Sequence, residues 1–367
     1  MKNICMYFNN LSLYRYSIYK MIDSEFKCDW YIEDVNTGVK EFSDSELGCV
    51  SRLSIKQLGS FYWTHGLLAL LKKDYDIYFM LGATRNLTLL PFCILKKIFF
   101  PEKRVYFWTH GYYGKESWLQ KSLWKRPMLK VADGVFTYGE YAKRLMLEDG
   151  FNDRRIYPIH NSLDYDNQLK LRNSIKATDI YSRHFGNDNP TLIFIGRLTE
   201  VKRLDMLIEA VSILKAKNEF YNLIFVGDGT IRNELEAMAK EKGISEQTWF
   251  WGECYDEEQN AELVYNADLC VAPGNIGLTS IHALMFGCPA ISHNNFSQQM
   301  PEFEVIKEGI TGDFYEYSNV NNLASTISKW FSNHKGQRNQ VREACYREID
   351  TLWNPYFQME VIRKYLK

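Results

Sequence analysis

The second half of the chain alternates short apolar runs with longer stretches in which apolar residues recur every three or four positions. Thr191–Ile195 and Asn222–Val226 are short, apolar and partly β-branched, and a glycine follows each of them. Such runs are typical of buried strands that end in tight turns. Between them, residues 203–217 have the apolar spacing of an amphipathic helix. The pattern predicts a strand, a helix and a second strand.

The same alternation continues to about residue 292. It predicts, in order, strand 249–251, helix 256–266, strand 268–272, helix 280–286 and strand 288–292. Strands and helices that alternate at this spacing form a parallel sheet covered on both faces, and its ligands bind beyond the carboxyl ends of the strands. We therefore expect the loops at these ends to converge on one crevice: 196–202, 227–230, 252–255 and 273–279.

The first half is less regular but similar. Residues 1–8, 77–81, 105–109 and 134–138 are predicted to be strands, with helical patterns between them. Residues 168–189 are polar and have no clear apolar period. We expect the boundary of two domains there, with 1–167 as the first domain and 168–350 as the second.

Composition and charge add an asymmetry to this picture. Of 367 residues, 46% are apolar and 24% are charged, which suits globular domains with a core in each half. The formal net charge of −1 gives no global attraction to nucleic acid. Residues 1–165 nevertheless carry 23 Lys/Arg against 18 Asp/Glu, and the remainder carries 21 against 27. A basic half beside an acidic half indicates different partners for the two.

The cysteines and the apolar runs bear on the compartment. None of the eight cysteines has metal-ligand spacing and several lie in apolar runs, so buried reduced thiols are favoured over disulfides or zinc. The mixed N-terminal stretch is not a signal peptide, and no run reaches the roughly 18 apolar residues that span a bilayer. We expect a cytoplasmic protein, with a peripheral position on the inner face of the plasma membrane as a further possibility.

Two cations follow the strand that ends at Ile195. Gly196 supplies the turn, and Arg197 and Lys202 lie five residues apart before the next predicted helix. A guanidinium holds phosphate oxygens through a two-pronged contact, and a lysine adds a point charge. The alternative is a pair of solvated surface cations. The strand–glycine–arginine context favours phosphate binding.

A glycine-containing loop, 273–278, precedes the helix predicted at 280–286. The free N–H groups and the dipole at the start of a helix suit a diphosphate. Alternatively, the hydroxyls of Thr279 and Ser280 only cap the helix. His282 lies in its first turns, where it either hydrogen-bonds a ribose hydroxyl or is a satisfied, partly buried histidine.

These motifs, in this order and spacing, resemble the nucleotide-binding half of the family 4 glycosyltransferases, the group 1 type. The matching stretches are 192–198, 202–205, 223–229, 252, 267–268, 273, 277–278, 283–289 and 309–312. The resemblance covers residues 191–330 well and the first half loosely. It implies the α/β GT-B fold, two Rossmann-like domains whose parallel sheets face each other across a cleft. It also implies that 353–367 packs back on the first domain.

The resemblance assigns roles residue by residue. The family's arginine and lysine on the donor diphosphate correspond to Arg197 and Lys202. The two glutamates of its E-x7-E motif correspond to Gly274 and His282, so this chain departs from the motif at both ends. His282 stands where a glutamate holds the donor ribose. Gly274 stands where a glutamate contacts the transferred sugar, and the adjacent Asn275 is the candidate substitute. The predicted donor-binding residues are Gly196, Arg197, Lys202, Gly227, Tyr255, Asn275, Gly277, Leu278, Thr279 and His282.

The first half supplies two further candidates. His110 follows the strand 105–109, and the resemblance implies that it lies at the interdomain cleft close to the donor sugar, as the catalytic residue. The alternative is a structural histidine at a strand end. Arg15, in a Tyr14-Arg15 pair after the first strand, is assigned to the acceptor or to a phosphate.

A basic stretch bears on the acceptor. Residues 96–130 hold nine Lys/Arg against two Glu, interleaved with Phe, Trp and Leu. This composition suits an amphipathic helix on an anionic bilayer, and a solvated cationic face is the alternative. The aromatic residues could equally stack on sugar rings.

Together these features predict a glycosyltransferase that moves a sugar from a nucleoside-diphosphate donor to a glycan or polyprenyl-linked acceptor. We expect it to act in surface polysaccharide assembly, such as capsule or lipopolysaccharide, and by resemblance to retain the anomeric configuration. We expect no metal or cofactor and no nucleic acid partner. The alternatives are a non-catalytic GT-B subunit, which the altered glutamate motif favours, and a sugar-nucleotide epimerase of the same fold.

Overall fold

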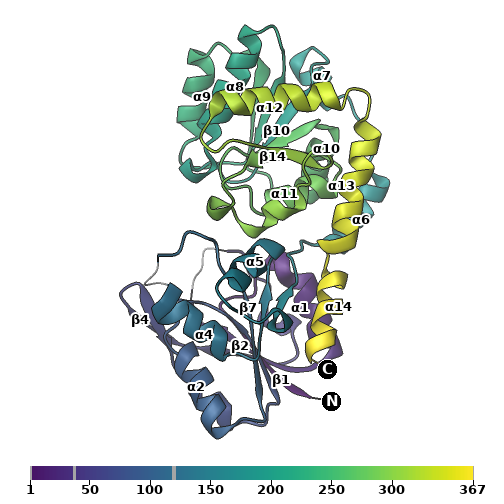
Figure 1. Ribbon diagram of the computed structural model, residues 1–367. Helices are drawn as coiled ribbons and strands as arrows, with labels where there is room; N and C mark the ends of the chain where they lie inside the picture. Colours follow the sequence, from purple (N-terminus) through teal and green to yellow (C-terminus); the bar gives the residue numbers. More distant parts are fainter. Residues whose placement is uncertain (1, 36–38, 118–120, 367) are drawn as a thin grey trace. The chain divides into compact units, whose positions relative to one another are not determined.

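Two parallel sheets, one in each half of the chain, carry the fold (Figure 1). The structure is a computed structural model that describes residues 2–35, 39–117 and 121–366. The N-terminal unit comprises Met1–Asp164 and Asn354–Lys367, and the C-terminal unit comprises Tyr165–Trp353. The expected α/β class is confirmed in both units.

The sheet of the N-terminal unit has the strand order β3-β2-β1-β6-β7-β8-β9, and all its described pairings are parallel. Its strands are β1 (Asn3–Phe8), β2 (Lys27–Glu33), β3 (Val50–Leu53), β6 (Ile77–Leu81), β7 (Arg104–Thr109), β8 (Gly134–Thr137) and β9 (Ile156–Pro158). An antiparallel hairpin of β4 (Ile55–Leu58) and β5 (Phe61–Thr64) lies outside this sheet. The α-helices are α1 (Tyr16–Glu25), α2 (Leu89–Phe99), α4 (Arg126–Val131), α5 (Glu140–Glu148) and α14 (Pro355–Leu366).

Both faces of this sheet are buried. Along β1, Ile4, Met6 and Phe8 belong to one apolar cluster and Cys5 and Tyr7 to another, as the two-residue period of a strand requires. Helix α14 packs beside α1 (Figure 1) and contributes Met359, Ile362 and Leu366 to the first cluster. The last described helix of the chain is therefore part of the N-terminal core.

The sheet of the C-terminal unit has the order β12-β11-β10-β13-β14-β15, again parallel. Its strands are β10 (Thr191–Ile195), β11 (Asn222–Val226), β12 (Thr248–Gly252), β13 (Leu269–Val271), β14 (Ala290–His293) and β15 (Gly312–Tyr315). Its α-helices are α6 (Tyr165–Ser174), α7 (Ile180–Phe185), α8 (Leu204–Ala216), α9 (Arg232–Glu241), α10 (Glu257–Asn266), α11 (Thr279–Met285), α12 (Val320–Asn333) and α13 (Arg338–Leu352). Both units also contain short helical turns. Those of the N-terminal unit include η1 (Leu13–Arg15), η3 (Leu67–Lys72) and η4 (Lys121–Lys125), and those of the C-terminal unit include η6 (Glu200–Lys202) and η9 (Pro301–Val305).

The strands and helices predicted for the second half are confirmed, with ends shifted by one or two residues. In the first half, the four predicted strands are confirmed as β1, β6, β7 and β8. Residues 168–189, in which the sequence shows no clear apolar period and for which we expected a domain boundary, carry most of α6 and all of α7. Their tertiary contacts are largely polar, for example from Gln168 to Glu257 and from Arg172 to Asp350, which explains the missing apolar period.

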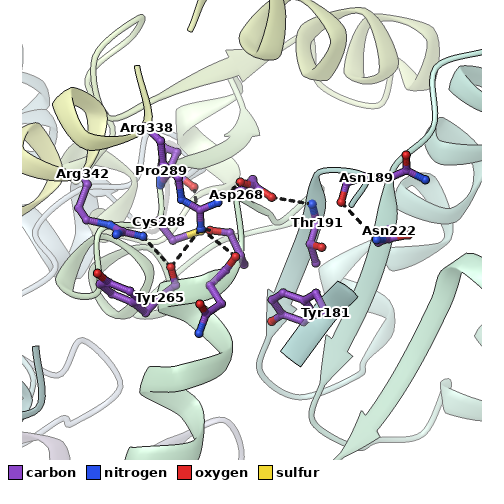
Figure 2. Close-up of polar contacts among 12 residues, drawn as sticks. Tyr181, Asn189, Thr191, Asn222, Tyr265, Asp268, Cys288, Pro289, Arg338 and Arg342 are labelled. Carbon is purple, nitrogen blue, oxygen red and sulfur yellow. Dashed lines mark hydrogen bonds and ion pairs between the residues drawn. The ribbon is translucent and has the colours of Figure 1, made fainter. Parts of the chain in front are cut away.

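Two arginines hold α13 on the C-terminal unit (Figure 2). Arg338 donates to main-chain carbonyls at the end of α10 and pairs with Asp268. The other oxygen of Asp268 accepts from the N–H of Thr191, where β10 begins, at 2.8 Å. Arg342 donates to the carbonyl of Tyr265 at 2.7 Å and lies over its ring. The helix is thereby tied to the amino-terminal edge of the sheet.

The eight cysteines are free thiols, and five of them are buried: Cys5, Cys93, Cys270, Cys288 and Cys345. Burial raises the pKa of these thiols, so they stay protonated at neutral pH. The burial expected for the cysteines in apolar runs is confirmed for Cys93 and Cys270.

Candidate functional site

Each unit has one point at which the strand order reverses. In parallel sheets, the loops after the two strands that flank such a point form the ligand crevice. In the C-terminal unit the two strands are β10 and β13, and in the N-terminal unit they are β1 and β6.

The loop after β10 is shaped by close backbone packing. A Cβ atom on Gly227 would lie 2.0 Å from the carbonyl oxygen of Gly196, and one on Gly229 would lie 2.1 Å from that of Leu198. The N–H of Leu198 donates to the carbonyl of Asp228 at 2.9 Å. The loops after β10 and β11 therefore touch through their main chains, which requires glycine at 227 and 229.

Lys202 joins the loop after β10 to the loop after β13. Its Nζ donates to the main-chain carbonyl of Asn275 at 2.8 Å and to the side-chain Oδ1 at 2.9 Å. Burial lowers the pKa of Lys202 to about 8, the Glu302 carboxylate opposes this shift, and Arg197 adds to it. Arg197 itself is exposed, and within the described parts of the chain its side chain has no hydrogen bond or ion pair. The loop thus offers one half-buried cation and one that is free to turn toward an anion.

Gly274 leaves no room for a side chain. Its Cβ atom would lie 2.0 Å from the carbonyl oxygen of Val201 and 2.7 Å from main-chain atoms of Lys202. Its own N–H donates to the Lys202 carbonyl at 2.8 Å. The position that corresponds to the first glutamate of the E-x7-E motif is closed by the neighbouring backbone.

The hydroxyls at the start of α11 bond to the main chain of other elements. Thr279 Oγ1 donates to the carbonyl of Ile195 at 2.9 Å, which ties α11 to the end of β10. Ser280 Oγ donates to the carbonyls of Gly277 and Glu302 at 2.8 and 2.9 Å. The N-cap residue is Leu278, and no side chain caps the helix there. The capping role considered for the two hydroxyls is therefore wrong, because both are aimed at carbonyls rather than at N–H groups.

Gly277 has φ +56, in the left-handed region that favours glycine. It precedes Leu278, and the turn lets the chain enter α11. Tyr255, at the end of the loop after β12, is 67% exposed, and its hydroxyl donates to Glu253.

His282 pairs with a carboxylate. Its Nε2 lies 2.9 Å from Oε1 of Glu257, and Gln168 Nε2 donates to the same oxygen at 2.7 Å. Burial raises the pKa of Glu257, but the charge and hydrogen bond of His282 and the bond from Gln168 outweigh it, so the net shift is downward. Glu257 is therefore ionised at neutral pH, and it joins α6, α10 and α11 at one point.

The N-terminal reversal point holds a cavity of about 470 Å³. The loops after β1, β6 and β7 line it, and Arg15 and His110 are both in its wall. Arg15 is 5% exposed, donates to the hydroxyls of Tyr19 and Tyr138, and lies 5.3 Å from the ring centre of Trp108.

His110 lies against two aromatic rings, with centroid distances of 4.6 Å to Tyr138 and 5.5 Å to Tyr113. Burial, followed by the charges of Arg15 and Lys125, lowers its pKa to about 3. The imidazole is therefore neutral at physiological pH, the form in which a histidine accepts a proton.

The structure places the predicted donor residues Gly196, Lys202, Gly227, Asn275 and Thr279 in direct contact around the ends of β10, β11 and β13. Arg197, Tyr255, Gly277, Leu278 and His282 lie on the same loops or on α11. Arg15 and His110 meet in the other unit.

Sequence reasoning missed Glu257, Gln168 and Glu302. Glu257 starts the helix predicted at 256–266, at the same sheet edge as His282, and that shared edge is the signal that could have found it. Gln168 lies in the segment interpreted as a boundary. Glu302 lies in η9, which no pattern predicted.

The basic stretch 96–130 contributes to a groove of about 860 Å³ beside the start of β7. Seven cations and one carboxylate line this groove: Lys96, Lys97, Arg104, Lys130, Arg154, Arg155 and Lys364, with Asp133. The cations are spread over several elements and not along one amphipathic helix. Ile98 and Phe99, next to the groove in sequence, are 63% and 66% exposed. Trp118 and Leu119, which formed part of the prediction, lie outside the described residues.

The described residues contain neither a metal-binding cluster nor a membrane-spanning helix. No group of three or more His, Cys, Asp or Glu side chains in these residues is arranged to hold a metal ion. In the same residues, no helix is both long enough and apolar enough to cross a membrane.

Comparison with known proteins identifies relatives. Residues 176–347 match the family model described as glycosyl transferases group 1. EpsD of Bacillus subtilis, a provisionally named glycosyltransferase, is 29% identical over 272 residues, which are 69% of this chain and 66% of EpsD. EpsF of the same organism is matched over 50% of its length. The chain therefore spans less than two thirds of these curated relatives.

Solved structures resemble the whole chain. HepE of Anabaena, solved in complex with UDP, has a TM-score of 0.74 at 15% identity and covers 100% of this chain and 99% of its own. The lipopolysaccharide outer core galactosyltransferase WaaB, solved in its apo form, has a TM-score of 0.72 at 14% identity, with 99% coverage of both chains. These likenesses confirm the GT-B fold.

Proposed function

Residues 176–347 place this chain among the group 1 glycosyltransferases, and from that premise we propose that it transfers a sugar from a nucleoside-diphosphate donor. The observation that carries the proposal is the cation pair at the C-terminal reversal point. Lys202 bridges the loops after β10 and β13, and the guanidinium of Arg197 on the same loop has no hydrogen bond or ion pair with the described residues. Two cations at the carboxyl edge of a parallel sheet suit the charge that develops on a departing diphosphate.

The donor ribose is held by His282 with the help of Glu257. Because Glu257 is ionised, it fixes the proton of His282 on Nε2, and Nδ1 is then a hydrogen-bond acceptor. Nδ1 has no partner among the described residues. Nδ1 of His282 thereby accepts from a ribose hydroxyl where the family's glutamate would do so. Gly227, Tyr255, Gly277, Leu278 and Thr279 complete the donor site, and Asn275 contacts the transferred sugar.

The N-terminal unit receives the acceptor, a glycan or polyprenyl-linked saccharide of surface polysaccharide assembly, with His110 as the catalytic residue. The neutral imidazole in the wall of the cavity supports this assignment. The similarity to WaaB supports the pathway class. The basic groove with Ile98 and Phe99 beside it brings this cytoplasmic enzyme to the anionic inner face of the plasma membrane. We expect transfer with retention of configuration and without a metal.

One observation favours a second candidate function, a non-catalytic GT-B subunit. The backbone around Gly274 excludes the glutamate that corresponds to the sugar-contacting position. If Asn275 does not replace it, the protein binds a nucleotide without transferring a sugar.

A thermal-shift screen with UDP, GDP, ADP, dTDP and CMP tests the proposal. A ligand at 100 times its dissociation constant adds about 2.7 kcal/mol to the free energy of unfolding. We expect one nucleoside diphosphate to stabilise the protein and the Arg197→Ala variant to lose that effect. Arg183→Ala, an exposed arginine of the same unit, is the matched control.

The outcomes separate the two candidates. Stabilisation by one nucleotide, followed by hydrolysis or transfer of its sugar, supports the enzyme. Stabilisation without turnover of any of its sugar nucleotides supports the non-catalytic subunit. If no nucleotide stabilises the protein, both candidates fail.

A further inference from the structure

We propose that the cavity at the N-terminal reversal point binds a phosphate group through Arg15, and that this group belongs to the acceptor. The anion site stands on the structure of this unit alone, and the identity of the acceptor rests on the function proposed above. The acceptor class is then a phosphate-bearing saccharide or lipid, not a neutral glycan.

Arg15 is a buried cation without an opposite charge beside it in the parts of the chain that the structure describes. Arg15 is 5% exposed, and its Nε atom is buried without a hydrogen-bond partner among the described residues. Within the described parts of the chain, the guanidinium donates hydrogen bonds only to two tyrosine hydroxyls, from Tyr19 and Tyr138. A buried charge without an opposite charge is costly, and proteins retain such groups where a ligand supplies the missing charge.

Arg172 provides a comparison within the same chain. Its side chain is 8% exposed, close to the exposure of Arg15, but it forms a two-pronged pair with Asp350 at 2.9 and 3.0 Å. The chain thus follows the usual rule for a buried arginine at one site and departs from it at the other.

Neither the described residues nor the undescribed ones supply an acidic partner for Arg15. In the described residues, no carboxylate forms an ion pair with it. The residues outside the description, 1, 36–38, 118–120 and 367, include neither Asp nor Glu. The counter-charge of Arg15 therefore does not come from an acidic side chain of this chain.

The cavity beside Arg15 has the size and the position of a ligand site. Its volume of about 470 Å³ falls in the usual range for small-molecule sites, and it lies at the reversal point where α/β sheets bind ligands. The described residues of its wall mix apolar and polar side chains and include no carboxylate. The lining groups with hydrogen-bonding capacity include Asn9, Ser12, Arg15, Thr109, His110 and Lys125.

The field inside the cavity is positive. Arg15 and Lys125 both depress the pKa of His110, so both act on the same space. Lys125 is paired with Glu116 at 2.6 Å, which leaves Arg15 as the uncompensated charge. A dianion such as phosphate matches a guanidinium flanked by hydroxyl and amide donors.

Two substrates are candidate sources of the phosphate, the acceptor and the donor. The C-terminal unit already offers Arg197 and Lys202 for the donor diphosphate, so we assign the Arg15 cavity to the acceptor. The experiment separates these sources.

Inorganic phosphate and pyrophosphate are titrated into four proteins, each with Arg197→Ala to silence the donor site. These are the Arg197→Ala parent and the same protein with Arg15→Met, Arg15→Lys or Arg144→Met. Arg144 is an exposed arginine on α5 and serves as the matched control. Binding is followed by thermal shift and by the 15N shift of arginine Nε groups, which needs no further variant.

We expect the parent and the Arg144→Met protein to bind phosphate or pyrophosphate. Arg15→Met should weaken binding about 10- to 100-fold, as loss of a charge-assisted contact does, and Arg15→Lys should weaken it less. An Nε signal that moves on titration of the parent and is missing in Arg15→Lys supports the site even if Arg15→Met does not fold. Absence of binding to the parent, or equal binding to all four proteins, overturns the proposal.

A second arm uses the protein with intact Arg197 and the nucleotide found by the screen. If Arg15→Lys leaves nucleotide binding unchanged, the phosphate belongs to the acceptor. If Arg15→Lys weakens nucleotide binding as strongly as phosphate binding, the acceptor assignment is overturned. Failure of the nucleotide screen alone rejects the proposed function and leaves phosphate binding to the Arg197→Ala parent as a separate result.

Discussion

The two reversal points of this protein have the same topology, but their positively charged side chains differ in burial and in the partners that compensate the charge. In the C-terminal unit, Arg197 is exposed and Lys202 is compensated by two oxygen atoms of Asn275. In the N-terminal unit, Arg15 is buried among aromatic rings and pairs with no carboxylate of the described residues. An exposed cation costs little in the absence of ligand, whereas a buried one depends on it. The shared reversal of strand order therefore leaves the chemistry of the crevice to a few loop residues.

The largest effect expected is at the C-terminal point. Lys202→Ala removes both a cation and the bridge to Asn275, so we expect kcat/KM for the donor to fall about 10²- to 10³-fold. Steady-state kinetics with the sugar nucleotide found by the screen measures it. Lys217→Ala, an exposed lysine after α8, should leave the rate unchanged. An unchanged rate in Lys202→Ala would remove the distinction between the two points.

The second prediction concerns the closed position at Gly274. Gly274→Glu restores the residue of the E-x7-E motif, yet its Cβ would meet the Val201 carbonyl. We expect the free energy of unfolding to fall by about 1–3 kcal/mol and nucleotide binding to weaken. Urea denaturation measures the first effect. Gly48→Ala, where the added Cβ meets nothing closer than 3.6 Å, is the control. Tighter donor binding in Gly274→Glu would contradict this account.

The sequence predicts the C-terminal reversal point better than the N-terminal one. Arg197 and Lys202 follow β10, a short β-branched run that periodicity identifies, so their place at the sheet edge follows from local pattern. The neutral state of His110 and the burial of Arg15 depend on Trp108 and Tyr138, which are distant from residue 15 in the chain. Local patterns carry no information on such contacts.

The fold divides in the same way. After their polar first residues, Thr191 and Asn222, β10 and β11 are apolar, and the sequence predicts them to the residue. β2 mixes Lys27, Asp29 and Glu33 with apolar residues, and β9 has only three residues, so neither has a readable period. The pairing of His282 with Glu257 joins residues 25 positions apart and required the structure.

The third prediction tests whether the C-terminal point uses a histidine as its ribose acceptor. Glu257→Ala frees the tautomer of His282, so we expect nucleotide binding to weaken about 10-fold and discrimination against 2′- or 3′-deoxynucleotides to shrink. Calorimetry with the nucleotide and its deoxy analogues measures both. Glu258→Ala, an exposed neighbour on α10, is the control. Full discrimination in Glu257→Ala would show that His282 needs no partner.

The smallest effect expected is at the N-terminal point. The pKa of His110 is about 3 in the folded protein, below its ordinary value, so the unfolded state binds more protons in the interval between them. Stability therefore falls as the pH drops from about 6.5 toward 3. Between pH 7 and about pH 5.7, we expect the free energy of unfolding to fall by about 1 kcal/mol less in His110→Gln than in the wild type, as measured by urea denaturation. An identical acid loss in both proteins would show that His110 is solvated.

The place of α14 has a consequence for how the protein is made. Its residues Met359, Ile362 and Leu366 complete the core around β1, although they follow the whole C-terminal unit in the chain. A ribosome therefore releases every strand of the C-terminal unit before the N-terminal core can close. The half that is translated first therefore completes its folding last, and until then chaperones can bind the exposed apolar face of its sheet.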